Sequence, residues 1–268
     1  MTRHQPLHLT KHHGLGNDFL VALAAANPSL DPSAERAREL CDRHRGIGAD
    51  GLVWGLAPAD PEHDLRMVLH NADGSAAEIS GNGIRCLGQA FLRDRGERSG
   101  VVLIETEAGL RRLQSGPTDD DDTDMLVVDM GPVGRGPDAP EVEGGLRQLS
   151  LSVGNPHLVI EVDELASIDP AERGPVIAAT VPGGINVHFL APGGPDVVRL
   201  LHWERGAGVT EACGSGAVAA AVAAGRWGLA GDSVTVRMPG GDAVVTVTAD
   251  GAATTLSGPA TFVAEVWV

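Results

Sequence analysis

The residues with the clearest chemical potential stand in two short glycine-containing segments, one in each half of the sequence. Ser80 precedes Gly81–Asn82–Gly83, and Cys213 precedes Gly214–Ser215–Gly216. Each segment places a hydroxyl or a thiol directly before a turn that is expected to open a helix. The first N–H groups of a helix lack partners within it and carry partial positive charge, so such an end binds a carboxylate. It is also expected to lower the pKa of a thiol placed there.

The surroundings of these two segments repeat, which indicates an internal duplication. Asn71–Ala72–Asp73–Gly74–Ser75 leads to the first segment, and Glu204–Arg205–Gly206–Ala207–Gly208 leads to the second over the same distance. Gly16–Asn17–Asp18 and Gly154–Asn155–Pro156 form another pair in the same order. The two pairs are offset by 133 and 138 residues. Similar offsets favour two homologous halves over chance similarity in a glycine-rich chain.

Two duplicated helix starts that meet at a cleft would face a ligand from opposite sides. One side chain could then take an α-proton from one face of a carbon centre while the other donates a proton to the opposite face. The helix ends would stabilise the charge that develops on the carboxylate, and no cofactor is required. The alternative for Cys213 is a buried structural thiol. Cys86 is expected to pack within its helix, and Cys41 is given no role.

The segments that follow the two sites are predicted helices. Ile84–Leu92 stops near Gly96, and Ala217–Ala224 is apolar on all sides, which is typical of a buried central helix. Short β-type runs dominate elsewhere, many of them bounded by Gly, Pro or Asp: Leu65–Leu69, Val101–Glu105, Met125–Met130, His157–Val162, Asn186–Leu190, Val234–Met238, Ala243–Val247 and Thr261–Val268. The sequence therefore predicts an α+β fold of two pseudo-symmetric halves, each a mostly antiparallel sheet wrapped around a central helix.

The halves are expected to divide near the acidic run Asp119–Asp122, which is interpreted as a solvated loop near the junction and not as a metal site. Residues 1–123 would form the N-terminal half with Ser80, and residues 124–268 the C-terminal half with Cys213. The last strand, about residues 261–268, is a candidate to return to the N-terminal half.

Composition narrows the classes of function. The 268 residues are 43% apolar and carry a net charge of −16, which fits a globular protein and disfavours a nucleic-acid partner. Three cysteines without a C-x-x-C pair argue against a disulfide framework or a structural zinc site. No apolar run is long enough to span a membrane. Phe19–Ala26 could pass for the core of a signal peptide, but Asp18 abuts it, so a cytoplasmic protein is expected.

Along most of its length the chain resembles the diaminopimelate epimerase family. The resemblance rests on motifs in a fixed order: His13–Gly14–Leu15–Gly16–Asn17–Asp18–Phe19, Gly46–Ile47–Gly48–Ala49–Asp50, Asn71–Ala72–Asp73–Gly74–Ser75, Gly81–Asn82–Gly83–Ile84–Arg85–Cys86, Asp129–Met130–Gly131, Gly154–Asn155–Pro156–His157, Glu204–Arg205–Gly206–Ala207–Gly208, Ala212–Cys213–Gly214–Ser215–Gly216 and Pro239–Gly240–Gly241. Each motif alone is weak, but their shared order makes the match specific.

The resemblance implies an isomerase that converts LL- to meso-diaminopimelate in lysine and peptidoglycan precursor biosynthesis. It implies a bacterial cytoplasmic enzyme that needs neither pyridoxal phosphate nor a metal, acts on a small amino acid and is often a homodimer. It assigns proton transfer to Cys213 and position 80, with Glu204 and His157 tuning that pair. It assigns substrate binding to Asn17, Asn71, Gly81, Asn82, Asn155, Asn186, Glu204, Arg205, Gly214 and Ser215. From the sequence pattern alone, Asn71 and Asn186 are better explained as turn residues.

Two residues depart from the family pattern. Ser80 stands where the family has a cysteine, and Gly51 stands where it usually has a glutamine that would contact substrate. A hydroxyl is a much weaker acid than a thiol and needs an adjacent base, which Glu204 or His157 could supply. Three hypotheses follow: a natural Ser/Cys pair that still epimerises, an engineered replacement that slows turnover, or proton exchange or elimination at one face only.

Other functions remain open at this stage. A proline or hydroxyproline racemase or epimerase would use the same paired bases, but the asparagines and Arg205 suit a ligand with a second amino-acid end. An impaired diaminopimelate-binding variant, in which Ser80 has removed one base, is another alternative. A nucleotide-binding protein is disfavoured because no P-loop lysine follows either glycine loop.

Overall fold

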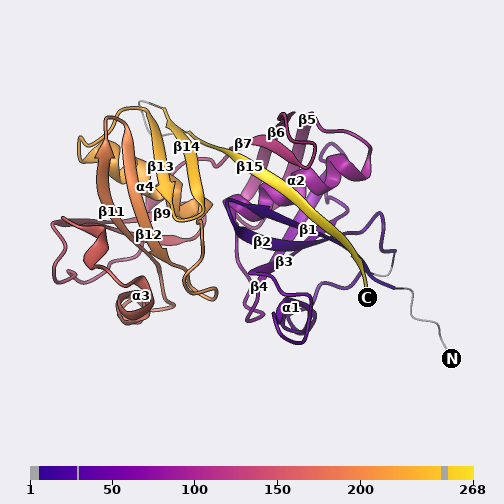
Figure 1. Ribbon diagram of the computed structural model, residues 1–268, viewed down its shortest axis with the longest axis horizontal. Helices are drawn as coiled ribbons and strands as arrows, with labels where there is room; N and C mark the ends of the chain where they lie inside the picture. Colours follow the sequence, from indigo (N-terminus) through magenta and orange to yellow (C-terminus); the bar gives the residue numbers. More distant parts are fainter. Residues whose placement is uncertain (1–5, 29, 249–252) are drawn as a thin grey trace.

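The computed structural model, which describes residues 6–28, 30–248 and 253–268, consists of two lobes that lie side by side (Figure 1). The strands of the first lobe pack around helix α2 (Gly81–Asp94). They are β1 (His8–Gly14), β2 (Asn17–Leu23), β3 (Gly51–Leu56), β4 (Leu65–Asn71), β5 (Gly100–Thr106), β6 (Gly109–Pro117) and β7 (Thr123–Asp129).

The strands of the second lobe pack in the same way around helix α4 (Gly214–Arg226). They are β8 (Gly134–Arg135), β9 (Arg147–Ser152), β10 (Pro156–Glu161), β11 (Asn186–Gly194), β12 (Val197–Trp203), β13 (Ser233–Met238), β14 (Gly241–Val247) and β15 (Thr254–Trp267). The α+β class and the sheet wrapped around a central helix are therefore confirmed.

The order of strand pairings is repeated in the two lobes. From β1 to β7 successive pairs are antiparallel, parallel, antiparallel, parallel, antiparallel and antiparallel. The series from β9 to β15 has the same sequence of pairings. Helix α1 (Ala34–Cys41) connects β2 to β3, and α3 (Pro170–Ala178) connects the equivalent strands β10 and β11. Parallel neighbours require such crossover connections. The repeated topology supports the duplication inferred from the sequence.

Strand β15 joins the two lobes, and Figure 1 shows it in yellow as it crosses from one to the other. It pairs with β14 over Thr254–Ser257, with β7 over Thr255–Thr261 and with β1 over Thr261–Trp267. All three pairings are antiparallel. One continuous strand therefore holds the sheets of both lobes in a fixed register.

The two central helices are buried and carry clear boundary signals. Ser80 and Cys213 cap their N-termini. Helix α2 ends before Gly96, whose φ of 72° is left-handed, so the predicted glycine stop is confirmed. The residues of α4 from 214 to 224 are all buried, as its uniformly apolar sequence predicts.

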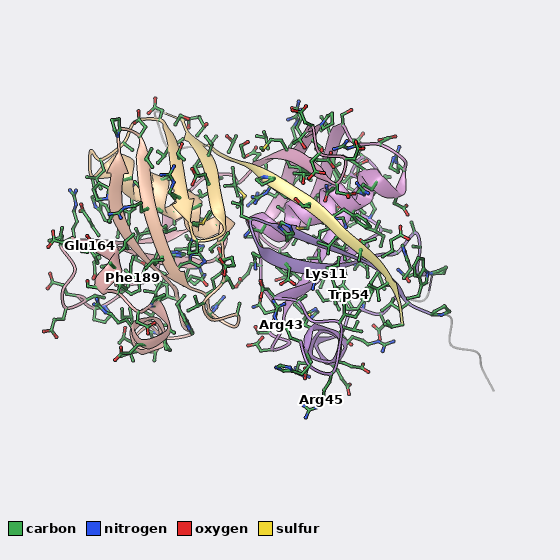
Figure 2. All side chains as sticks on the ribbon, viewed as in Figure 1. Lys11, Arg43, Arg45, Trp54, Glu164 and Phe189 are labelled. Carbon is green, nitrogen blue, oxygen red and sulfur yellow. The ribbon has the colours of Figure 1, made fainter. Side chains whose placement is uncertain are left out.

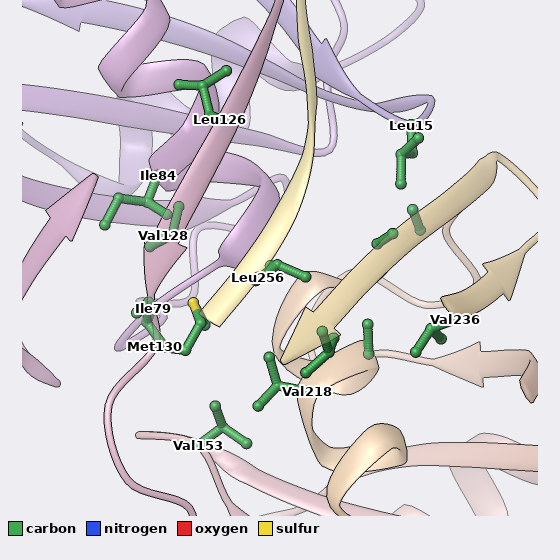
Figure 3. Close-up of a cluster of buried hydrophobic side chains, with 14 of the residues drawn as sticks. Leu15, Ile79, Ile84, Leu126, Val128, Met130, Val153, Val218, Val236 and Leu256 are labelled. Atoms are coloured by element: carbon green, nitrogen blue, oxygen red, sulfur yellow. The ribbon is translucent and has the colours of Figure 1, made fainter. Parts of the chain in front are cut away.

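Three hydrophobic clusters form the interior. The largest runs through both lobes and includes Ile84 and Val128 from the first and Val218 and Val236 from the second (Figure 3). A separate cluster lies under α1 and includes Trp54, and its counterpart near α3 includes Phe189. Figure 2 labels these two aromatic side chains, one in each lobe. The shared core explains why the helix starts of the two lobes can be held against each other.

Some elements differ from the sequence expectation. Helices α1 and α3 were not predicted, because α1 buries only Ala37, Leu40 and Cys41 and α3 contains an internal Pro175. The apolar run that begins at Phe19 lies largely in β2, all of which is buried. The acidic run forms an exposed turn between β6 and β7, where Asp121 and Asp122 pair with Arg98 and Arg93. No helix in the described part of the chain is long and apolar enough to cross a membrane.

Candidate active site

Ser80 and Cys213 occupy equivalent positions at the starts of α2 and α4. Both have extended backbones, with φ and ψ of −132° and 124° for Ser80 and −123° and 109° for Cys213. The Ser80 Oγ accepts a hydrogen bond from the Gly83 N–H at 3.1 Å, and the Cys213 Sγ accepts one from the Gly216 N–H at 3.3 Å. The sequence pattern of a reactive side chain before a glycine turn therefore corresponds to two N-caps.

The two helix starts touch through their first glycines. A Cβ added to Gly214 would lie 2.7 Å from the Cα of Gly81, and one added to Gly81 would lie 2.9 Å from the Cα of Gly214. Any side chain at either position would collide with backbone. Glycine is therefore needed to bring the two positively polarised helix ends to one place.

A cavity of about 420 Å³ reaches Ser80, the N-cap of α2. Its lining comes from both lobes, and seven of the predicted site residues contribute to it: Asn17, Asn71, Ser80, Asn155, Asn186, Glu204 and Arg205. The other predicted residues are not part of the lining, namely His157, Cys213 and the helix-start residues Gly81, Asn82, Gly214 and Ser215. Most of the predicted set is thus brought together at one place.

Cys213 is connected to the cavity through Glu204. Cys213 is only 2% exposed, and its thiol interacts with the Glu204 carboxyl, which lines the cavity. Burial raises the pKa of Cys213 well above its usual range, and the Glu204 charge raises it further. The Gly216 N–H opposes this shift but does not overcome it. The expectation of a lowered thiol pKa is therefore wrong, because burial and a neighbouring carboxylate outweigh one helix end.

The Glu204 carboxyl belongs to a network of hydrogen bonds with Thr210 and His202. Burial raises the pKa of Glu204, while the neighbouring Cys213 thiol and the hydrogen bond from Thr210 act in the opposite direction. The Thr210 hydroxyl donates to Glu204 Oε1 and is itself 2.9 Å from the Nε2 atom of His202. A carboxyl with a raised pKa beside a thiol is suited to exchange a proton with it.

Ser80 reaches the cavity directly, but its hydroxyl lacks the base that sequence reasoning expected. Within the described residues, neither Glu204 nor His157 hydrogen bonds to Ser80, whose partner is the Gly83 N–H. His157 instead bonds to Asn155 Oδ1 at 2.7 Å and to His188 Nε2 at 2.9 Å. Direct tuning of position 80 or 213 by His157 therefore stays a prediction without a direct contact in this conformation.

Asn17 is held in one orientation by two partners. Its amide nitrogen donates to Asp50 Oδ2 at 2.7 Å, and its oxygen accepts from the Asn82 amide at 2.9 Å. An amide nitrogen has two N–H donors, so Asn17 retains one for a ligand in the cavity that it lines. Asn82 also donates to the Ala212 carbonyl at 2.8 Å, which ties α2 to the residue before Cys213.

Asn71 and Asn186 both line the cavity and both have structural partners. The Asn71 amide donates to Ser75 Oγ at 3.0 Å within a turn. The Asn186 amide donates to the Pro156 carbonyl at 2.8 Å and accepts from the Arg205 backbone N–H at 2.9 Å. The sequence-based reading as a turn residue fits Asn71, but it is wrong for Asn186, which begins strand β11 and pairs with β10. The role of both residues toward a ligand stays a prediction.

The charges around the cavity are mostly carboxylates. Asp50, Asp73, Glu78 and Glu204 line it, and Arg205 is the cation among the lining residues. Arg205 bridges the lobes through a 3.4 Å ion pair with Glu78. Such a lining favours a ligand that carries ammonium groups, with helix ends and amide N–H groups available for its carboxylates.

A buried cation supports the first helix start. Arg85 is fully buried, and its guanidinium donates to Asn82 Oδ1 at 2.6 Å and to the carbonyls of Gly81 and Pro259 at 3.1 Å and 3.3 Å. Burial lowers the pKa of Arg85 to about 10, which leaves it charged at neutral pH. Its positive charge adds to that of the adjacent helix ends.

The surroundings of Gly51, the second departure from the family pattern, leave little room for a side chain. A Cβ at this position would lie 2.9 Å from the His70 carbonyl oxygen and 3.1 Å from the ring of Phe19. Phe19 lines the cavity, whereas Gly51 does not. The Phe19 ring therefore occupies the space that a side chain at position 51 would need.

Sequence reasoning missed several residues of the site. Asp50 and Glu78 line the cavity, and Asp50 fixes Asn17. Asp50 belongs to a glycine-rich motif that was recognised but given no role. His188 is a buried neighbour of His157, and their 31-residue separation offers no local signal.

The duplicated lobes, and the contact between their two capped helix starts beside one cavity, fit an isomerase that acts on amino acids. Similarity to known protein families identifies the kind of isomerase. A family model described as diaminopimelate epimerase matches residues 9–135 and 149–263. The chain therefore belongs to the diaminopimelate epimerase family, and the resemblance stated from its motifs is confirmed.

Individual relatives agree with this assignment. The diaminopimelate epimerase of Halothermothrix orenii is 38% identical over 255 residues, which cover 88% of this chain and 89% of that protein. The one from Pseudomonas entomophila is 37% identical over 276 residues, covering 97% and 98%.

Solved structures show the same fold at low identity. A hydroxyproline epimerase from Agrobacterium vitis with bound trans-4-hydroxy-L-proline has a TM-score of 0.74 and 21% identity, and covers 100% of this chain and 92% of its own. A phenazine biosynthesis protein from Bacillus anthracis has a TM-score of 0.74 and 16% identity, with 99% coverage of both chains.

Proposed function

We propose that this protein interconverts LL- and meso-diaminopimelate by proton transfer at the two faces of one α-carbon. The observation that carries the proposal is the contact between two helix starts, each capped by a side chain that can exchange a proton. A ligand carboxylate seated against both helix ends would place its α-carbon between positions 80 and 213. Side chains of this chain alone would then supply both proton transfers.

The cavity lining supports a substrate with two amino-acid ends. The helix ends and the amides of Asn17 and Asn155 are suited to the carboxylate next to the reacting carbon. Arg205 is placed for a second carboxylate, and the lining carboxylates are placed for ammonium groups. A proline or hydroxyproline ligand has one carboxylate and one ammonium group, so it would leave much of this lining unpaired.

The two faces of the reaction are chemically unequal. Cys213 would exchange its proton with the substrate while Glu204 holds or releases the thiol proton. Ser80 would deliver or accept a proton at the opposite face, and the developing carboxylate charge would be stabilised by the helix ends. Because a hydroxyl is a much weaker acid than a thiol, the step at Ser80 is expected to limit turnover.

The setting of the reaction belongs to the same proposal. We infer a role in lysine and cell-wall precursor synthesis, in the cytoplasm, with the protein as a homodimer. The family assignment supports these inferences, and the relatives carry the same enzyme name.

The test is solvent exchange with stereochemical analysis. The protein is incubated with LL- and with meso-diaminopimelate in heavy water, and both deuterium entry and epimer composition are followed. The expected result is deuterium in both epimers with interconversion. Deuterium entry without inversion from either substrate would eliminate the paired mechanism, and binding without any exchange would identify an impaired variant. Parallel incubations with L-proline and trans-4-hydroxy-L-proline are expected to show no exchange.

Position 80 is tested by substitution. Ser80→Cys should raise kcat by about 10²-fold, the range of an improved acid–base group, if the hydroxyl limits proton transfer. Ser75 also lines the cavity, so Ser75→Cys is the matched control and should not accelerate the reaction. An unchanged rate in Ser80→Cys would remove position 80 from the proton path.

A further inference from the structure

An ion-pair network adjoins the cavity in the first lobe, and the proposed mechanism does not yet use it. Its centre is Arg43, which stands in the connection between α1 and β3. The Arg43 guanidinium donates to both carboxylate oxygens of Asp18, at 2.7 Å and 3.2 Å, and to Asp50 Oδ1 at 2.8 Å. One cation thus holds two carboxylates, and Asp50 lines the cavity.

The surrounding chain is shaped to bring Arg43 to these carboxylates. A Cβ added to Gly48, whose φ is 84°, would lie 2.9 Å from the Cα and 3.0 Å from the Cγ of Arg43. Glycine at position 48 therefore leaves room for the arginine side chain. The Lys11 ammonium donates to the Gly48 carbonyl at 2.7 Å and pairs with Asp18 at 2.9 Å. Burial alone would raise the pKa of Asp18, but hydrogen bonds from Arg43 and Lys11 hold it below its ordinary value.

Asp50 transmits this constraint to Asn17. The Asp50 Oδ2 atom accepts from the Asn17 amide nitrogen at 2.7 Å and from the Asp18 backbone N–H at 3.1 Å. A carboxylate only accepts, so it determines which end of the Asn17 amide faces it and leaves the second N–H of that amide for another partner. Within the described residues, the hydrogen bond to the other oxygen, Oδ1, comes from Arg43. The orientation of the carboxylate that holds Asn17 therefore depends on this arginine.

We propose that Arg43 is a positioning residue for the epimerisation, acting through Asp50 on the amide of Asn17. Arg43 fixes the Asp50 carboxylate, and Asp50 orients Asn17. The free N–H of Asn17 then meets the substrate carboxylate beside the reacting carbon. Arg43 also offsets the negative charge of Asp50, which would otherwise repel the same substrate carboxylate. The proposal rests on the proposed function, which assigns that carboxylate to the helix ends and Asn17.

The exposure of Arg43 favours this role over a purely structural one. Its side chain is 53% exposed, whereas the side chains of Asp18 and Asp50 are 12% and 21% exposed. Ion pairs of exposed side chains contribute little to stability, so folding alone does not account for the network. A planar guanidinium instead fixes geometry, because its N–H groups point in set directions toward the two carboxylates.

The effect of Arg43 on Asn17 can be measured without substrate. NMR spectra of protein labelled with nitrogen-15 asparagine report the Asn17 side-chain amide, whose signals are assigned by their loss in Asn17→Ala. In the wild-type protein we expect one amide proton to be protected from solvent exchange, because it is bonded to Asp50. In Arg43→Met this proton should exchange about 10-fold faster, the factor that corresponds to one weakened hydrogen bond. Equal exchange in both proteins would overturn the proposal, whatever the substrate proves to be.

The role in turnover is tested by a double-mutant cycle on kcat/KM for LL-diaminopimelate. Arg43→Met should lower kcat/KM by about 10-fold, the factor for one hydrogen bond to a charged group. Because Arg43 acts through Asp50, adding Arg43→Met to Asp50→Ala should change kcat/KM by less than about twofold.

Arg45→Met is the matched control for Arg43→Met. The Arg45 side chain is 89% exposed at the outer edge of the lobe (Figure 2), and its ion pair is with Asp42 at 3.9 Å. Surface ion pairs of this kind contribute little, so Arg45→Met should keep kcat/KM within about twofold of wild type. A loss in Arg45→Met equal to that in Arg43→Met would assign the effect to surface charge and overturn the proposal.

The remaining outcomes separate the possible failures. A loss in Arg43→Met that persists in full in the Asp50→Ala background would show that Arg43 acts through Asp18 or folding, and would overturn the proposal. A wild-type rate in Arg43→Met would also overturn it. If the wild-type protein is inactive on diaminopimelate, the proposed function fails, and amide exchange still decides whether Arg43 orients Asn17. If Arg43→Met does not fold, Arg43→Lys, which keeps the charge without the planar fork, replaces it in both measurements.

Discussion

The contact between Gly81 and Gly214 gives the sharpest prediction about how the two lobes form one site. In Gly214→Ala the new methyl group would meet only backbone: the Cα and carbonyl carbon of Gly81 at 2.7 Å and 2.9 Å, and the Asn82 nitrogen at 3.0 Å. Carbon atoms in contact prefer about 3.5–4.0 Å, so the helix starts must separate by about 1 Å. No flexible side chain can move aside to prevent this.

Two effects of this separation set the expected losses of activity and stability in Gly214→Ala. A displacement of about 1 Å between catalytic groups costs about 10²-fold in rate, so kcat/KM for LL-diaminopimelate should fall by that factor. Overpacking costs about 1–3 kcal/mol, and the preference of helices for alanine over glycine returns at most about 1 kcal/mol. The free energy of unfolding should therefore fall by about 1–2 kcal/mol, measured by urea denaturation.

A glycine elsewhere in α4 supplies the control. A Cβ at Gly225 would have no described heavy atom within 4 Å, so Gly225→Ala should keep full activity and gain up to about 1 kcal/mol. The reasoning is refuted if Gly214→Ala retains kcat/KM within about twofold of wild type. A stability loss with normal activity would show that the close approach holds the lobes together but is not needed for catalysis.

The remaining predictions concern the cavity lining and acid stability. Gly51→Gln should lower the free energy of unfolding by about 1–3 kcal/mol, because its side chain would collide with Phe19, and Gly51→Gln/Phe19→Leu should recover part of that loss in urea denaturation. Glu78→Gln should change the free energy of unfolding by less than about 1 kcal/mol, because the ion pair between Glu78 and Arg205 is partly exposed. The substitution should lower KM for diaminopimelate, because Arg205 is then free to bind a substrate carboxylate. An unchanged KM would contradict this role of Arg205. The free energy of unfolding should fall on acidification from pH 6.5 toward pH 4. Burial lowers the pKa of His157 to about 3 and that of His202 to about 4, so the unfolded chain binds protons that the folded protein does not; a flat profile would exclude this cause.

Local sequence identified the parts of the site that depend on local chemistry. A hydroxyl or thiol before a glycine turn predicts an N-cap, and both Ser80 and Cys213 are N-caps. The uniform apolar character of α4 predicts its burial, and the repeated motifs predict two lobes with the same topology. Helix α1 escaped prediction because its few buried residues leave a weak pattern. The two crossover helices, α1 and α3, show little helical periodicity in their apolar residues. Their formation therefore depends on tertiary packing against the sheets.

By itself the sequence determined the duplication, the fold class, the family and seven of the eighteen residues that line the cavity, because each of these depends on residue types at short spacing. Only the tertiary structure decided the state of Cys213, whose pKa is raised because burial and Glu204 together outweigh the helix end. It also decided that His157 bonds to His188, and that Phe19 fills the space beside Gly51. Burial and electrostatic coupling depend on the distances between segments far apart in the chain, and no local pattern encodes those distances.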